Sequence, residues 1–299
     1  MTEPFKAIDA VCNLWTEEAL ALRPDDRKNF YVDKMRVDAH QFSGTSLVEM
    51  LRRMDLAGID QAFLIAHRCG PIGPPACWRL PYEMVAQAVA QHPDRFHALA
   101  GIDPTEGMSG VRALEHAVKE LGFIGAHGYP HWFELSPDNA RWYPFYAKCV
   151  ELDIPIQLQV GQSMIYSAGF PCQSVARPIT LDPVACHFPE LKLVGIHIGI
   201  PWAEEMIAMA WKHKNVYIGT DAHSPKYWPD SLARYIDSYG QDKVIFGTDF
   251  PILDFERTTR EIDQLNLRDG PKRKLLRDNV CTLYGLNCSS RDGLQARSV

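Results

Sequence analysis

The segment LKLVGIHIGIPW, residues 191–202, shows the pattern that decides the fold of this chain. An apolar run, residues 191–196, ends at a polar residue, His197, and Gly199 follows. Short apolar runs bounded in this way are typical of strands that are buried on both faces of a parallel sheet. The segment therefore predicts one strand of a strand–helix repeat.

The same pattern occurs eight times along the chain. The runs cover residues 7–11, 61–66, 97–102, 123–126, 155–160, 191–196, 216–218 and 244–246. Segments with apolar residues at helical spacing separate them, which indicates an α/β fold with helices on the outside of a parallel sheet. Eight units predict a (β/α)8 TIM barrel in a single domain, residues 1–288, followed by a polar tail, residues 289–299. A doubly wound open sheet is the alternative, but no GxGxxG follows the first run.

Composition and charge bound the class of protein. The chain has 299 residues, of which 46% are hydrophobic, and a net charge of -6. This charge disfavours nucleic acid as a partner and leaves a small-molecule substrate, with a homodimer as a possible assembly. No apolar stretch is long enough to span a membrane, and the N-terminus does not resemble a secretory signal.

The eight cysteines are scattered and show no paired CxxC spacing. A chain of this length needs no disulfides to stabilise its core. We therefore expect reduced thiols and a cytoplasmic protein. Cys12 lies near the end of the first predicted strand, but it should point away from Val11 and Asn13, so we expect it to pack between barrel and helices.

Polar residues follow the predicted strands, and in a βα barrel the carboxyl ends of all strands meet at one rim, where active sites form. The last strand, KVIFGTDFP, residues 243–251, brings Asp249 to this rim, and Gly247 permits close backbone approach. The alternative role of Asp249 is a helix cap. His197, at the end of the sixth strand, is the second candidate, although a single histidine there is more often structural. Two long connections, residues 14–44 and 162–178, should overhang this rim.

Residues 194–236, together with DKVIFGTDFP at residues 242–251, carry a family resemblance. They resemble the amidohydrolase-related family that contains aminocarboxymuconate semialdehyde decarboxylase, resorcylate decarboxylases, pyrone dicarboxylate lactonase and oxalomesaconate hydratase. The closing segment KRKLLRDNVCTLYGL, residues 272–286, resembles the family's terminal helix. The chain is also similar in background to hydroxyphenyl β-ketoacyl-CoA hydrolases. The resemblance implies that His197 is the catalytic histidine and Asp249 the aspartate.

The positions that match the family's other metal ligands have changed. The first strand of the family ends in Asp-x-His-x-His, whereas this chain has Val11 and Asn13 at the two histidine positions and Gln159 at the third. Valine offers no lone pair, and amides are poor ligands for zinc. We therefore expect no cofactor. The alternative is a divalent metal such as zinc in a rebuilt shell of His127, His197 and Asp249.

Further rim residues are candidates for contact with a substrate. Tyr129 and His127 follow the fourth strand, in a segment that suits an aromatic pocket. Arg68 could bind a carboxylate in a bidentate manner, although a surface salt bridge is at least as good an explanation. The predicted substrate-binding residues are Asn13, His67, Arg68, His127, Tyr129, Gln159 and His223.

Three functions fit these residues. The first is a metal-independent or metal-atypical hydrolase that cleaves a C–C or acyl bond of an aromatic or dicarbonyl metabolite through general-base activation of water by His197 and Asp249. The second is a metal-dependent nonoxidative decarboxylase of an aromatic or muconate-type acid. The third is a catalytically silent barrel that acts as a binding module.

Overall fold

Within residues 5–23, 30–70, 78–164 and 172–288, which the computed structural model describes, eight parallel strands form one sheet. Their order is β1-β2-β5-β6-β7-β8-β9-β10. The strands are β1 (Ala7–Asn13), β2 (Ile59–Ala66), β5 (Phe96–Ile102), β6 (Gly125–Gly128), β7 (Ile156–Gln159), β8 (Leu193–Ile196), β9 (Val216–Gly219) and β10 (Val244–Ile245). A short antiparallel hairpin, β3 (Arg68–Cys69) with β4 (Trp78–Arg79), follows β2.

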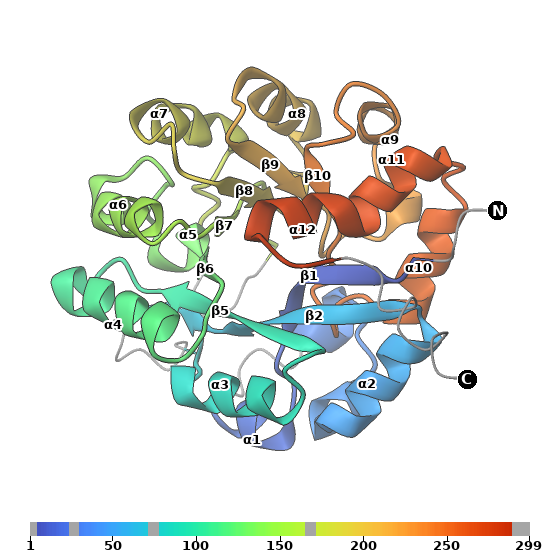
Figure 1. The fold of residues 1–299 in the computed structure, drawn as a ribbon, viewed down its shortest axis with the longest axis horizontal. Coiled ribbons are helices and arrows are strands. Elements are labelled where there is room, and N and C mark those ends of the chain that lie inside the picture. The colour runs from blue at the N-terminus through green and yellow to red at the C-terminus, as the bar shows by residue number, and fades with distance from the viewer. Residues whose placement is uncertain (1–4, 24–29, 71–77, 165–171, 289–299) are drawn as a thin grey trace, which may run out of the picture.

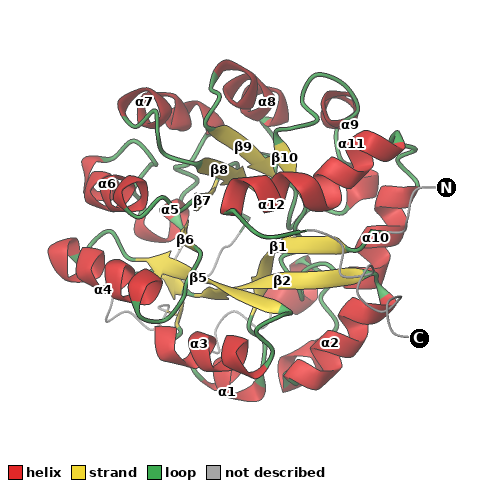
Figure 2. Cartoon of the chain, in the orientation of Figure 1, coloured by secondary structure: helices red, strands yellow, loops and turns green. Residues whose placement is uncertain are grey.

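Helices surround the sheet (Figures 1 and 2). They are α1 (Glu17–Ala21), α2 (Leu47–Leu56), α3 (Tyr82–Gln91), α4 (Gly107–Lys119), α5 (Pro130–Phe133), α6 (Tyr143–Glu151), α7 (Leu181–His187), α8 (Ala203–Lys212), α9 (Asp230–Ile236), α10 (Phe255–Asp263), α11 (Asp269–Arg273) and α12 (Asn279–Tyr284). Short 3-10 and π-helical turns lie at Phe30–Lys34, Ala39–Ser43, Ala140–Trp142, Pro178–Thr180, Pro225–Tyr227 and Lys274–Asp278. None of the helices in the described part of the chain is long and apolar enough to cross a bilayer.

Hydrogen bonds between the first and last strands close the sheet into a barrel. Ala10 N donates to Phe246 O at 2.9 Å, and Asp249 N donates to Val11 O at 2.8 Å. Gly247 permits this approach, because a Cβ there would lie 3.0 Å from the Cβ of Val11 and of Asp221. The predicted TIM barrel and all eight predicted strands are thus confirmed, with shifts of up to two residues at their ends. The predicted tail, residues 289–299, lies outside the described residues.

The seam between β1 and β10 is held by a fully buried carboxyl group, that of Asp9. Its Oδ1 accepts hydrogen bonds from the backbone N–H of Val11 at 3.1 Å and of Thr248 at 3.0 Å. Its Oδ2 accepts from the Thr248 hydroxyl at 2.5 Å. Burial raises the pKa of Asp9 to about 7, although these hydrogen bonds oppose the rise. Asp9 therefore links the two strands that position Asn13 and Asp249.

The raised pKa of Asp9 makes the stability of the barrel depend on pH. Between pH 4 and 7 the unfolded chain releases the Asp9 proton while the folded chain retains it, so this residue's contribution to folding falls as pH rises. We expect the unfolding free energy of the wild type relative to that of Asp9→Asn to fall by about 3 kcal/mol from pH 4 to pH 7. Urea denaturation at the two pH values measures it, and a relative free energy that stays constant or rises would contradict the prediction.

The expectation that every cysteine is reduced is wrong, because Cys281 and Cys288 form a disulfide. Helix α12 ends at Tyr284, and Gly285 adopts a left-handed conformation that returns the chain toward the helix. This turn brings Cys288 back to Cys281. Free thiols are present at Cys12, Cys69, Cys149, Cys172 and Cys186 within the described ranges, and Cys12 is fully buried, as predicted.

Candidate active site

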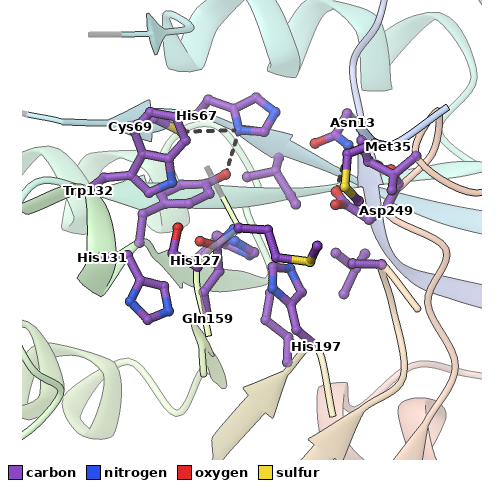
Figure 3. Close-up of a pocket in the computed structure, with 18 of the residues that line it drawn as sticks. Asn13, Met35, His67, Cys69, His127, His131, Trp132, Gln159, His197 and Asp249 are labelled. Carbon is purple, nitrogen blue, oxygen red and sulfur yellow. Dashed lines mark hydrogen bonds between the residues drawn. The ribbon is translucent and has the colours of Figure 1, made fainter. Parts of the chain in front are cut away.

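One pocket opens at the carboxyl ends of the strands (Figure 3). Its lining includes eight of the nine predicted site residues and both positions at which the family carries histidine ligands on the first strand. The predicted residues that line it are Asn13, His67, His127, Tyr129, Gln159, His197, His223 and Asp249. Arg68 does not line it. Instead its Nη1 lies 3.3 Å from Oε1 of Glu106, and this ion pair fits the alternative explanation from the sequence.

The two long connections also reach the pocket, as predicted. The segment after β1 contributes Tyr31 and Met35, and the segment after β7 contributes Ser163 and Met164. The Lys34 ammonium group donates a hydrogen bond to Met164 O at 2.9 Å, which joins the two segments. Segments that follow two distant strands of the barrel, β1 and β7, therefore meet beside the pocket.

His197, Asp221 and Asp249 form a cluster at the ends of β8, β9 and β10. One donor atom from each residue lies within 4.8 Å of the other two. The side chain of Asp221 helps to position His197, because its Oδ1 accepts a hydrogen bond from the His197 backbone N–H at 3.1 Å. The Asp221 Oδ2 and the His197 Nε2 lie 3.2 Å apart, yet both are buried without hydrogen-bond geometry to any partner. Two polar atoms thus remain available to a ligand.

Charge and burial act against each other in this cluster. Burial alone would lower the pKa of His197, but the carboxylates of Asp221 and Asp249 outweigh it and raise that pKa above its ordinary value. Burial raises the pKa of Asp249 to about 7, although His197 and Asn13 oppose the rise. The pKa of Asp221 is held below its ordinary value by His197 against the effect of burial. Perturbed groups of this kind mark functional sites.

The side chain of Asn13 holds Asp249 in place. Its Nδ2 donates to Asp249 Oδ1 at 2.8 Å and to Phe250 O at 2.7 Å. Asp249 is not the cap of the following helix, since Asp254 occupies that position in α10. The backbone at His197 (φ 67°), Ile198 (φ 61°) and Asp249 (φ 57°) is left-handed, a conformation that costs free energy outside glycine and that concentrates at functional sites.

His127 presents a lone pair to the pocket. Its Nδ1 lies 2.9 Å from Gln157 Oε1, and the Gln157 amide is fixed because its Nε2 donates to Ala10 O at 2.8 Å. The Nδ1 of His127 must therefore carry the proton, and its buried Nε2 has no hydrogen-bond partner. Burial lowers the pKa of His127 to about 4, so the imidazole is neutral at pH 7.

This hydrogen bond predicts the tautomer of His127. Nitrogen NMR of the metal-free protein should show His127 with its proton on Nδ1 and an unprotonated Nε2 at pH 7. Gln157→Leu should abolish this preference, because the acceptor of the Nδ1 proton is lost. An Nε2-protonated His127 in the wild type would contradict the arrangement described here.

Asp221 is a member of the cluster that was not among the site residues predicted from the sequence. The signal was present, because Gly-Thr-Asp occurs at residues 219–221 and again at 247–249. Sequence analysis also missed Trp15, Tyr31 and Trp78 in the pocket wall. These residues come from segments without a periodic pattern, so their meeting depends on tertiary structure.

The comparisons agree with this architecture. Residues 47–286 match the amidohydrolase family model, and the chain belongs to this family. A curated relative, gamma-resorcylate decarboxylase of Polaromonas sp., is 23% identical over 248 residues, which are 69% of this chain and 75% of the relative. An uncharacterised TIM-barrel protein of Bordetella bronchiseptica superimposes with a TM-score of 0.76 at 22% identity, over 94% of this chain and 99% of that one.

A dihydroxybenzoic acid decarboxylase of Polaromonas sp. was solved with bound manganese and the inhibitor 2-nitroresorcinol. It superimposes with a TM-score of 0.70 at 20% identity, over 98% of this chain and 100% of that chain. Manganese is also present in other solved relatives. The expectation of no cofactor is therefore wrong. It rested on the replaced positions Val11, Asn13 and Gln159. The rebuilt shell given as the alternative lacked the carboxylate that Asp221 adds to His197 and Asp249.

Proposed function

We propose that this protein catalyses the nonoxidative, divalent metal-dependent decarboxylation of an aromatic hydroxy acid. The observation that carries the proposal is the cluster of His197, Asp221 and Asp249 within a pocket walled by aromatic and histidine side chains. The resorcylate decarboxylases among its relatives support this function, which was the second of the three hypotheses. The comparisons do not support metal-independent hydrolysis.

The donor set fits a divalent ion. One imidazole and two carboxylates offer nitrogen and oxygen ligands, and carboxylates in particular suit manganese. The unpartnered Nε2 of His197 and Oδ2 of Asp221 are the atoms that an ion would satisfy. The proposed metal residues are thus His197, Asp221 and Asp249, with Asp221 in the place that sequence analysis gave to His127. A bound ion would supply positive charge to hold the substrate carboxylate and to withdraw electrons from the ring.

The remaining pocket residues position the aromatic ring. The His127 Nε2 lone pair can accept a hydrogen bond from a substrate hydroxyl, because Gln157 fixes its tautomer. Tyr129 and Trp132 supply aromatic surface on the same wall. The loops joined by Lys34 and Met164 limit the entry of water. The reaction breaks the C–CO2 bond, releases CO2 and places a proton on the ring carbon, with no change of oxidation state that needs a redox partner.

Metal removal tests this function. We expect purified protein to release CO2 from 2,6-dihydroxybenzoate or 5-carboxyvanillate, to lose this activity after treatment with a chelator, and to regain it with Mn²⁺. Hydrolysis of aromatic lactones and thioesters is followed in parallel by release of acid. Turnover of these esters that chelation leaves unchanged, together with no CO2 from either acid, would overturn the proposal.

A further inference from the structure

Two side chains that line the pocket, His67 and Trp78, and the neighbouring Arg23 carry three nitrogen atoms that have no hydrogen-bond partner within the described part of the chain. They are Arg23 Nη1, His67 Nε2 and Trp78 Nε1, and each is buried without a hydrogen-bond partner. Buried polar groups in proteins nearly always find a partner, and each one that does not needs an explanation. Three such atoms in one region indicate a place for a ligand rather than three separate defects.

The three side chains are in contact. The imidazole of His67 stacks on the indole of Trp78, with ring centroids 3.9 Å apart and an interplanar angle of 19°. The guanidinium carbon of Arg23 lies 5.2 Å from the Trp78 ring centroid and 4.0 Å from that of Tyr31. His67, Trp78 and Tyr31 all line the pocket. Figure 3 shows His67 across the pocket from Asp249 and His197.

His67 presents its proton at Nε2. The Tyr129 hydroxyl lies 2.5 Å from His67 Nδ1. Burial raises the pKa of Tyr129 well above its ordinary value, so this hydroxyl keeps its proton and can donate it to Nδ1. Burial also lowers the pKa of His67 far below its ordinary value, so the ring is neutral with a single proton. When Tyr129 donates to Nδ1, that proton is on Nε2, and His67 is then a hydrogen-bond donor like Trp78.

Arg23 brings positive charge to this region, and this charge also acts to lower the pKa of Asp249. Other arginines of the chain pair with carboxylates, as Arg53 does with Asp254 at 2.6 Å and Arg79 with Asp103 at 2.7 Å. Within the described residues no carboxylate pairs with Arg23, whose neighbours are aromatic rings. A guanidinium group whose described neighbours are aromatic rings still has N–H donors to offer, so an anion is a suitable complement.

We propose that Arg23, His67 and Trp78 form a subsite for a second anionic group of the substrate, a carboxylate, separate from the cluster at His197. The inference rests on the proposed function in that the metal cluster is taken to hold the carboxylate that leaves. Three N–H donors, one of them cationic, match the oxygen atoms of a carboxylate. The preferred substrates are accordingly aromatic acids with two carboxylates, of which one remains in the product.

Binding of unreactive probes tests the subsite. Calorimetry on the Mn²⁺-loaded protein compares benzoate with two dicarboxylates of different spacing, isophthalate and terephthalate. At least one dicarboxylate should bind about 10-fold or more tighter than benzoate, as a charge-assisted hydrogen bond predicts. Arg23→Met should remove this gain and change benzoate affinity by no more than about twofold. Trp78→Phe keeps the ring beneath His67 and removes one donor, so it should reduce the gain in part.

Arg177→Met is the matched control, because Arg177 also lies over a tryptophan, Trp202, but is paired with Glu205 outside the pocket. It should leave all affinities unchanged, and circular dichroism checks that each variant folds. Loss of benzoate and dicarboxylate affinity to the same extent in Arg23→Met, or no loss at all, would overturn the subsite. Failure of the proposed function appears separately, as an absence of CO2 release, while the preference for dicarboxylates persists.

Discussion

Replacing Asp249 by asparagine is expected to lower CO2 release by about 1000-fold or more and to reduce bound manganese to a small fraction of one ion per chain. Asp249 is the carboxylate that Asn13 orients through a 2.8 Å hydrogen bond, and its donor atom belongs to the cluster with His197 and Asp221. An asparagine of the same shape keeps the size of the side chain but removes its negative charge. Initial rates and metal analysis on the same sample measure both effects.

The matched control for this variant is Asp182→Asn. Asp182 forms a second cluster of potential ligands with Cys186 and His213 on the outside of the barrel, where Lys212 also pairs with it. Removing this carboxylate should change neither the rate nor the bound manganese. If Asp249→Asn turned over at the wild-type rate, or if manganese were lost only in Asp182→Asn, the assignment of the metal site to the pocket would be wrong.

Asp221→Asn is expected to have an effect of similar size, at least about 100-fold on the rate, for a different reason. The amide oxygen of the variant can still accept the His197 backbone N–H, so the turn after β8 should survive. The buried negative charge beside His197 Nε2 is lost, however, and the pKa of His197 should fall because Asp221 is the main group that raises it.

Proton NMR of His197 and manganese content separate the two roles of Asp221. A lower pKa of His197 in the metal-free variant together with weaker manganese binding supports a direct role in the cluster. Unchanged metal binding and rate in a variant with the lowered pKa would show that Asp221 only orients its neighbour.

The fold was predictable because it depends on the spacing of apolar residues, which can be recognised in each segment separately. Each apolar run is long enough to form a strand that is buried on both faces, and each is separated from the next by amphipathic spacing. The positions of His197 and Asp249 followed from the same periodicity, since a residue that ends a barrel strand must lie at the rim. Which residues lie next to His197 and Asp249 in space depends on the register of β8, β9 and β10.

The rest of the site was less predictable for physical reasons. The residues Val11, Asn13 and Gln159 at the usual ligand positions indicated that the metal site was lost. Asp221, however, lies near enough to His197 and Asp249 to complete a cluster of three potential ligands. Arg23 meets Trp78 only because the connection after β1 folds back over the rim, and neither residue belongs to a regular pattern. Contacts between loops are set by long-range packing, which a local reading of sequence does not contain.

The left-handed backbone at His197 and Asp249 also limits how far this barrel could be stabilised. Glycine is the residue that relaxes such a conformation, yet glycine at either position would delete a side chain of the cluster. Mutations selected for heat resistance alone should therefore accumulate there at the expense of turnover, whereas selection for turnover must retain a locally unfavourable main chain. Thermal robustness and chemistry thus compete at the same two residues.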